Sequence, residues 1–188
     1  MKNGLLFSLI AAGVLWRIGA ALHPALVNFV PVTALAFCGA VFLRDWRGWL
    51  AAIAVLTLSD PWINHVYASQ LGYTWDGAQM LLRLASLGAA FGLGLLVSRQ
   101  LSWVTLLGGA VLSSLAFYFI TNTASWATDP FYAKTALGWW QAMTVGHPEW
   151  PPTLLFLRNS LIGDLLFTGG VALVAFRSRR PAPVSIPS

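Results

Sequence analysis

Five ionisable residues lie within long apolar stretches of a chain in which only 9% of the residues are charged. They are Arg17, Asp60, Arg83, Arg158 and Asp164. An ionisable side chain inside a membrane is costly unless it is paired or wetted, so it indicates a functional site by default. Guanidinium groups bind anions through parallel hydrogen bonds. The residue types therefore indicate recognition of a small polar ligand, or pairing among the five side chains themselves.

Catalytic chemistry has little support in the sequence. It contains no HExxH, GxSxG, P-loop or Cys-x-x-Cys motif. His147 and Glu149 share a loop, and His23 and His65 could approach each other, but neither pair supplies the third ligand of a metal site. We expect no enzyme activity, no cofactor and no metal. A membrane enzyme that uses His147, Glu149 or Asp164 ranks last among the alternatives.

The composition is that of a helical membrane protein. Of the 188 residues, 57% are hydrophobic, whereas a soluble domain is usually about 45–50% apolar and about 25% charged. The formal net charge is +5, but no basic face is present to bind nucleic acid. The single cysteine, Cys38, excludes an internal disulfide and a multi-thiolate metal site, and is interpreted as a small packing residue.

Apolar runs near the ~20-residue membrane-spanning length predict an all-α bundle of six transmembrane helices over residues 1–176. Asp60-Pro61 is expected to end the third of them, because proline interrupts a helix. Arg17 interrupts the first run, which favours a membrane helix over a cleaved signal peptide. The second and third runs are short, and are expected to begin in the interface or to be shielded by neighbours. The predicted spans are Leu5–Leu22, Phe29–Leu43, Gly48–Ile63, Ala78–Val97, Leu101–Ile120 and Thr153–Phe176.

Basic residues near the ends of the spans predict the orientation. One side of the membrane would hold only Lys134. This asymmetry predicts a bacterial inner-membrane protein with both termini in the cytoplasm. Residues 177–188, which contain three prolines, are expected to form a disordered basic cytoplasmic tail at the anionic leaflet. The other side would hold Lys2, Arg44, Arg47, Arg99, Arg177, Arg179 and Arg180.

This orientation places most of the embedded polar groups at one depth, near the outer face. Three arginines and two aspartates leave one positive charge, which favours a neutral-to-anionic ligand in a pocket that opens outward. Three other interpretations stay open: arginines that snorkel to the headgroups, aromatic residues that form an interfacial belt, and arginine pairs with Asp60 and Asp164 that lock the bundle. The predicted ligand-binding residues are Arg17, Asn28, Asp60, Arg83, Asn122, Trp126, Arg158 and Asn159.

The long external loop, residues 124–152, has an amphipathic centre. A short helix is predicted over Lys134–Val145, with Trp139 and Trp140 on its surface. It would be either an interfacial anchor or a lid over the pocket.

Several segments carry a resemblance to a known family. They are Arg17, His23-Pro24, residues 28–36 (NFVPVTALA), Ser59-Asp60, and residues 119–122 (FITN) with Trp126. Over residues 14–175 the chain resembles small bacterial six-helix membrane proteins often labelled as substrate-binding (S) components of energy-coupling-factor (ECF) transporters. The resemblance implies an S-component-like fold and a vitamin-like or metal ligand captured from outside. It also implies a transmembrane coupling subunit and ATPases as partners, with Ser8, Ala11 and Ala12 as candidate contacts.

We therefore expect a membrane transport protein that binds a small polar ligand at the outer face and whose partners include the lipid bilayer but not nucleic acid. The alternative is a structural or assembly subunit of a larger membrane complex. In that case the charge pairs would lock the bundle, and the tryptophan-rich face would dock a partner.

Overall fold

The computed structural model describes residues 2–23, 26, 29, 31–43, 46–71 and 77–177. Within these residues the chain forms seven α-helices and no β-strand, which confirms the all-α prediction. Asn28 and the tail from residue 178 onward lie outside the described residues. The elements are α1 (Lys2–Ala21), α2 (Val32–Cys38), which continues into a π-helical turn η2 (Gly39–Leu43), α3 (Arg47–Leu71), α4 (Gly77–Val97), α5 (Trp103–Thr128), α6 (Ala136–Met143) and α7 (Thr153–Arg177).

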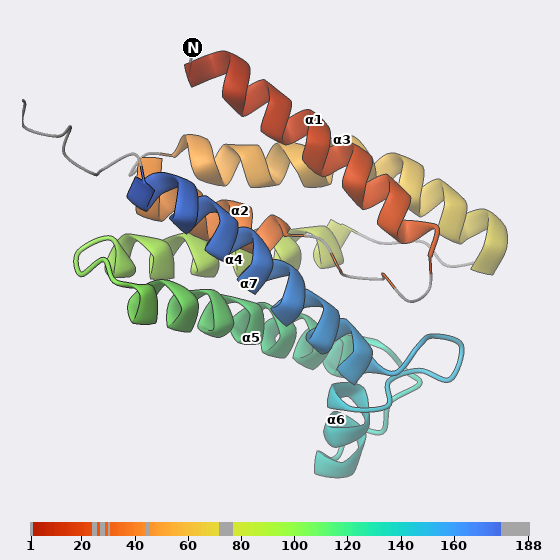
Figure 1. Ribbon diagram of the computed structural model, residues 1–188. Coiled ribbons are helices and arrows are strands. Elements are labelled where there is room, and N and C mark those ends of the chain that lie inside the picture. The colour runs from red at the N-terminus through yellow and green to blue at the C-terminus, as the bar shows by residue number, and fades with distance from the viewer. Residues whose placement is uncertain are drawn as a thin grey trace, which may run out of the picture.

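The long helices run along a common direction, and α6 lies apart at one end of the bundle (Figure 1). The start of α1, the start of α3, the α4–α5 turn and the end of α7 lie at the opposite end (Figure 1). Arg47, Arg99 and Arg177 belong to that opposite end, whereas Lys134 lies beside α6. Three of the arginines predicted to share one side of the membrane therefore lie at one end of the bundle, and Lys134 lies at the other.

Three helices are long and apolar enough to cross a membrane. Their spans are Gln79–Val97, Trp103–Thr128 and Thr153–Arg177. Among the described residues, the apolar parts of α1 and α2–η2 are shorter, Ile10–Ala21 and Val32–Leu43. Three of the six predicted spans thus have the length and composition of a membrane helix.

Helix α3 does not end at Asp60-Pro61, so that predicted boundary is wrong. The helix continues through Pro61 to Leu71. Proline removes one backbone hydrogen bond, but helices tolerate this loss where side-chain hydroxyls and neighbouring helices stabilise the interrupted turn. Here α1 packs along α3, and its Arg17 side chain donates to Ser59 and Asp60 in the turn that contains Pro61.

Helix α5 is also longer than predicted. It begins after Ser102, whose side chain accepts from the Thr105 N–H in a capping box, and it ends only at Thr128. The predicted span stopped at Ile120. Among the eight additional residues are Thr121, Asn122 and Ser125, which therefore lie on a helix rather than in a loop. The helix fixes the positions of these three side chains relative to one another.

Helix α2 is short but lies at the centre of the core. Ala36 packs with α3 and α4 in one hydrophobic cluster, and Phe37 packs with α5 and α7 in a second. Glycines permit this approach: a Cβ added at Gly94 would lie 2.5 Å from the Phe37 carbonyl oxygen, and one at Gly109 would lie 2.7 Å from Phe37 Cζ. The shielding expected for this short segment is provided by the surrounding helices.

Asp164 holds the buried start of α2. The first N–H groups of a helix lack intrahelical partners, and Pro31 offers no side-chain cap. Asp164 Oδ1 accepts the Ala34 N–H at 3.0 Å, and its Oδ2 accepts the Ser114 hydroxyl at 2.6 Å. Of the arginine pairs left open by the sequence, the one with Asp164 is not found within the described chain, where neutral donors satisfy this carboxylate.

Candidate ligand-binding site

Three charged side chains from three helices meet in an ion cluster. Arg17 of α1 donates to the Ser59 hydroxyl and to Asp60 Oδ1. Arg83 of α4 donates to Asp60 Oδ2 at 3.2 Å. The three charged side chains are only 11–14% exposed. Asp60 therefore bridges two guanidinium groups that the sequence separates widely, and the charges of these three groups sum to +1.

Local structure fixes each member of this ion cluster. Arg17 lies one turn before the end of α1, and Arg83 lies in the second turn of α4. Asp60 precedes Pro61 in the interior of α3. Ser59 accepts from Arg17 while donating to its own helix. Because both Ser59 and Asp60 hold Arg17, its guanidinium has one defined position.

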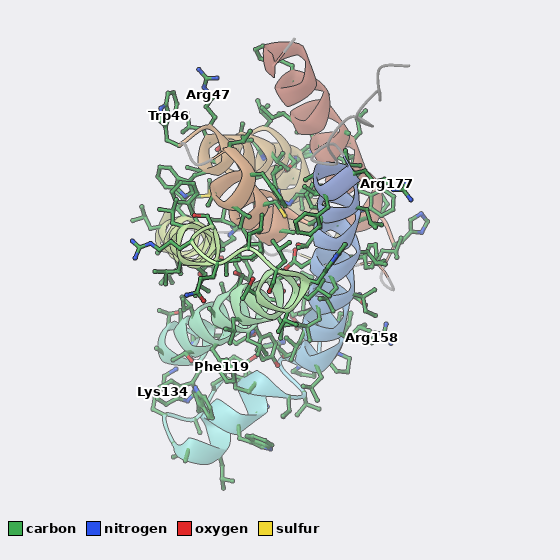
Figure 2. The ribbon with its side chains drawn as sticks, turned by 60° about the vertical axis from the view of Figure 1, so that its left-hand side comes forward. Trp46, Arg47, Phe119, Lys134, Arg158 and Arg177 are labelled. Carbon is green, nitrogen blue, oxygen red and sulfur yellow. The ribbon has the colours of Figure 1, made fainter. Side chains whose placement is uncertain are left out.

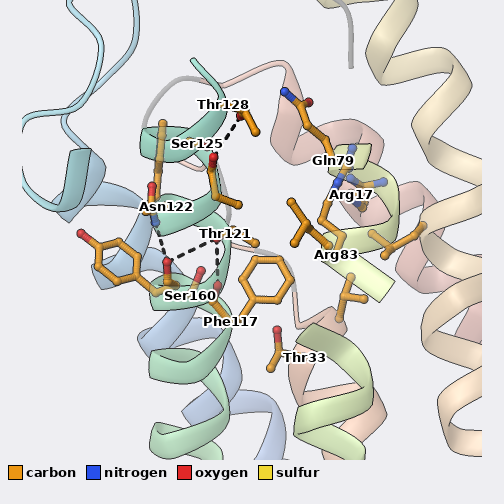
Figure 3. Close-up of a pocket in the computed structure, with 16 residues that line it drawn as sticks. Arg17, Thr33, Gln79, Arg83, Phe117, Thr121, Asn122, Ser125, Thr128 and Ser160 are labelled. Atoms are coloured by element: carbon orange, nitrogen blue, oxygen red, sulfur yellow. Dashed lines mark hydrogen bonds between the residues drawn. The ribbon is translucent and has the colours of Figure 1, made fainter. Parts of the chain in front are cut away.

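A cavity of about 300 Å³ lies beside the ion cluster, in the size range of small-molecule sites. Arg17, Gln79 and Arg83 line one side of it, and the last turns of α5 with Ser160 of α7 line the other (Figure 3). Asp60 is not among the described lining residues. Its carboxylate instead pairs with the two arginines that line the cavity. The remaining lining residues are Val32, Thr33, Leu56, Leu82, Phe117, Tyr118, Thr121, Asn122, Ala124, Ser125, Thr128 and Phe156.

The α5 side of the cavity presents hydrogen-bond acceptors. Thr121, Ser125 and Thr128 follow a spacing of four and three residues, which places them on one helix face. The Thr121 hydroxyl donates to the Phe117 carbonyl at 2.8 Å, and the Asn122 amide nitrogen donates to the Tyr118 carbonyl at 2.8 Å. The Thr121 hydroxyl hydrogen and one N–H of Asn122 are thus engaged by the helix itself, while both side-chain oxygens keep acceptor capacity. The cavity consequently has a donor-rich arginine wall opposite an acceptor-rich α5 wall.

The other predicted site residues lie away from this cavity. Trp126 donates its indole N–H to the Ala133 carbonyl at 2.9 Å and so holds the turn after α5. Arg158 donates to Asn159 Oδ1 at 3.1 and 3.3 Å. It projects from the outer side of α7 (Figure 2), and Asn159 is buried. Shared depth in the sequence did not distinguish which face of a helix each residue occupies.

Seven polar lining residues are absent from the predicted set: Thr33, Gln79, Tyr118, Thr121, Ser125, Thr128 and Ser160. The spacing of Thr121, Ser125 and Thr128 is the signal that could have found the α5 members. It was not used because the predicted span ended at Ile120. Thr33 and Ser160 are isolated polar residues within apolar runs, and nothing in their local sequence marks them.

Helix α6 lies beside the cavity region and does not cover the cavity. None of the residues 129–152, all of them described, lines it. Trp139 donates to the Thr123 hydroxyl at 3.1 Å, and Tyr118 donates to the Met143 carbonyl, so α6 is fastened to α5. Leu137 and Trp140 are 81% and 61% exposed. These contacts and exposures favour an interfacial anchor over a lid.

Metal ligands do not gather anywhere in the described part of the chain. It contains no group of three or more His, Cys, Asp or Glu side chains that could hold an ion. His147 and Glu149 are 3.8 Å apart at the surface, without a third ligand.

The chain belongs to a family of unknown function, DUF6580, which matches residues 1–183. No curated protein and no solved structure matches the chain. Membership of this family assigns no activity, so any functional conclusion depends on the chemistry of the cavity.

Proposed function

We propose that this member of the DUF6580 family is a membrane-embedded binding component that captures a small polar ligand, neutral to anionic, in the cavity between Arg17, Arg83 and α5. The observation that carries the proposal is the ion cluster: Asp60 and Ser59 fix two guanidinium groups at the edge of a cavity. Preorganised guanidinium donors are suited to carboxylate or phosphate oxygens.

The two walls of the cavity define the expected ligand further. Carboxylate, phosphate or carbonyl oxygens would face Arg17 and Arg83. Hydroxyl or N–H groups would face the oxygens of Thr121 and Asn122. A vitamin-like organic molecule combines such groups. A bare metal cation is disfavoured because two cations already line the cavity.

We place six helices across the bacterial inner membrane: α1, α2–η2, α3, α4, α5 and α7. The end that holds Arg47, Arg99 and Arg177 would face the cytoplasm, following the preference of basic residues for that side. The cavity would then lie near the outer face. Three helices with membrane-spanning length and composition support this placement.

The function would be transport. The sequence resemblance to ECF substrate-binding components implies a role as the capturing subunit of a transporter, although the family that matches the chain carries no such name. The sequence contains no P-loop, so energy would come from a transmembrane coupling subunit with ATPases, or transport would be passive. We propose no enzymatic activity, because the described residues around the cavity include no nucleophile–base pair.

A structural role in a larger complex is the second candidate. Its support is that Asp60 pairs with both arginines within the same chain, as a bundle lock would. Such a subunit would co-purify with large partners and retain no small molecule. Bound small molecules therefore distinguish the two functions.

The test is mass spectrometry of small molecules retained by gently purified protein. Wild type and Arg158→Gln, whose changed arginine lies outside the cavity, should retain the same molecule. Arg83→Lys keeps the charge but loses the planar fork, and Asn122→Ala leaves the ion cluster intact. Both should reduce retention at least tenfold. Equal retention by all four proteins, or no retained molecule in wild type, would refute the proposal.

A further inference from the structure

A second, apolar cavity adjoins the first. This groove of about 350 Å³ is bordered by α1, α2, α3 and α7. Its described lining includes Ala12, Gly13, Trp16, Leu35 and Leu166, and none of its described lining residues is charged. The one side-chain nitrogen, Trp16 Nε1, donates to the Phe29 carbonyl at 2.7 Å. The groove is therefore chemically the opposite of the cavity beside the ion cluster.

Neighbouring residues connect the two cavities. Val32, at the start of α2, lines both of them. On α1, Trp16 lines the groove and the next residue, Arg17, lines the polar cavity. On α3, Val55 lines the groove and Leu56 lines the polar cavity. Three helices thus each contribute to both sites, and the lining residues nearest the shared border, Val32, Val55 and Leu56, pack in one hydrophobic cluster.

Building on the proposed function, we infer that the ligand is an amphiphile, with a small polar or anionic head between Arg17 and α5 and an aliphatic chain in the groove beyond Val32. The charged walls of one cavity complement the head, and the apolar walls of the other complement the chain. An apolar cavity of about 150 Å³ suffices for a benzene-sized molecule, so the groove accommodates a short alkyl chain.

The rim of the groove suggests the route of entry. Leu166 and Trp16 are 65% and 48% exposed, and Ala12 is exposed beside them. In the proposed membrane orientation these side chains face lipid. An alkyl chain that enters from the bilayer moves from one apolar environment to another, so the free energy of this transfer is close to zero. The polar head of the ligand would exchange the membrane interface for guanidinium groups that are already fixed in place.

The test uses two aqueous series of short probes, alkyl phosphates and alkyl carboxylates with one, four or six alkyl carbons, titrated into protein in lipid nanodiscs. Each methylene that leaves water should tighten binding about fourfold until the groove is filled. Ala12→Phe should fill the groove from its exposed rim and remove this dependence on chain length, while the one-carbon probe binds as before. Ala11→Phe, whose position is exposed and outside the described groove lining, should behave as wild type.

Different failures have different meanings. Equal affinity for all chain lengths in wild type would overturn the amphiphile inference and leave a polar ligand in place. A chain-length gain that persists in Ala12→Phe would also overturn it, because the chains would then be partitioning into the bilayer. Failure of every probe to bind wild type would contradict the proposed function as well.

Discussion

Asp60 and Asp164 are both buried carboxylates in apolar helices, yet their surroundings differ. Asp60 faces two guanidinium groups beside a cavity, and its residue is 9% exposed. Asp164 is 1% exposed and accepts from neutral donors, the Ala34 N–H and the Ser114 hydroxyl. A costly charge in an apolar helix therefore has two structural uses here: one carboxylate holds two guanidinium groups beside a cavity, and the other holds the start of a helix inside the bundle.

The largest expected effect comes from Asp60→Leu. It leaves two guanidinium groups without their carboxylate, and breaking a buried pair costs about 3–5 kcal/mol. Thermal unfolding in nanodiscs should show this loss of stability, and ligand retention should vanish. The triple variant Arg17→Met, Asp60→Leu, Arg83→Met removes all three charges. It should regain stability without regaining binding; recovered binding would show that the cluster only locks the bundle.

Asp164→Leu should also destabilise the fold but should act differently on binding. It leaves the Ala34 N–H unsatisfied, at about 1–3 kcal/mol, whereas the Ser114 hydroxyl can still donate to the Ala110 carbonyl at 3.1 Å. Asp164→Asn keeps one acceptor oxygen and should cost less. The fraction that remains folded should bind ligand with wild-type affinity, since Asp164 does not line the described cavity. A loss of affinity as large as that of Asn122→Ala would remove the distinction between the two aspartates.

The packing of η2 against α3 provides a purely structural reference. A Cβ added at Gly39 would lie 2.3 Å from Gly48 Cα, and the converse distance is 2.2 Å. Because backbone atoms cannot move aside cheaply, Gly39→Ala should lower the unfolding temperature. Gly108→Ala, where an added Cβ meets nothing within 4 Å, should be neutral or slightly stabilising. Equal effects of the two changes would contradict this close approach.

The smallest stability effect is expected for Thr121→Val, which removes one hydroxyl from the acceptor wall. Loss of a ligand hydrogen bond worth about 1.4 kcal/mol weakens binding about tenfold. Unfolding should shift little, because the hydroxyl otherwise bonds only within its own helix. Unchanged affinity, measured by titration of the retained ligand, would show that α5 is not a binding wall.

Hydropathy predicted where the helices lie, because a membrane helix needs a long apolar run. It did not predict where α3 and α5 end. Pro61 was interpreted as a terminus, although α1 packs along the helix there and Arg17 bonds Ser59 and Asp60. The grouping of Arg17, Asp60 and Arg83 could be predicted from their shared depth in the membrane and their opposite charges. The role of Asp164 was not, since capping the start of α2 depends on a contact across 130 positions of sequence.

The central claim is that a ligand occupies the space between the arginines and α5. Its most direct test is protection of a cysteine placed there: Ser125→Cys in a Cys38→Ser background, labelled with a water-soluble maleimide in nanodiscs. Ser125 is exposed and lines the cavity, whereas Ala127 on the same helix is exposed and is not among the described lining residues. Small molecules released from wild-type protein should slow labelling of Ser125→Cys and leave Ala127→Cys unchanged. Unslowed labelling of Ser125→Cys, or equal slowing at both positions, would contradict the claim.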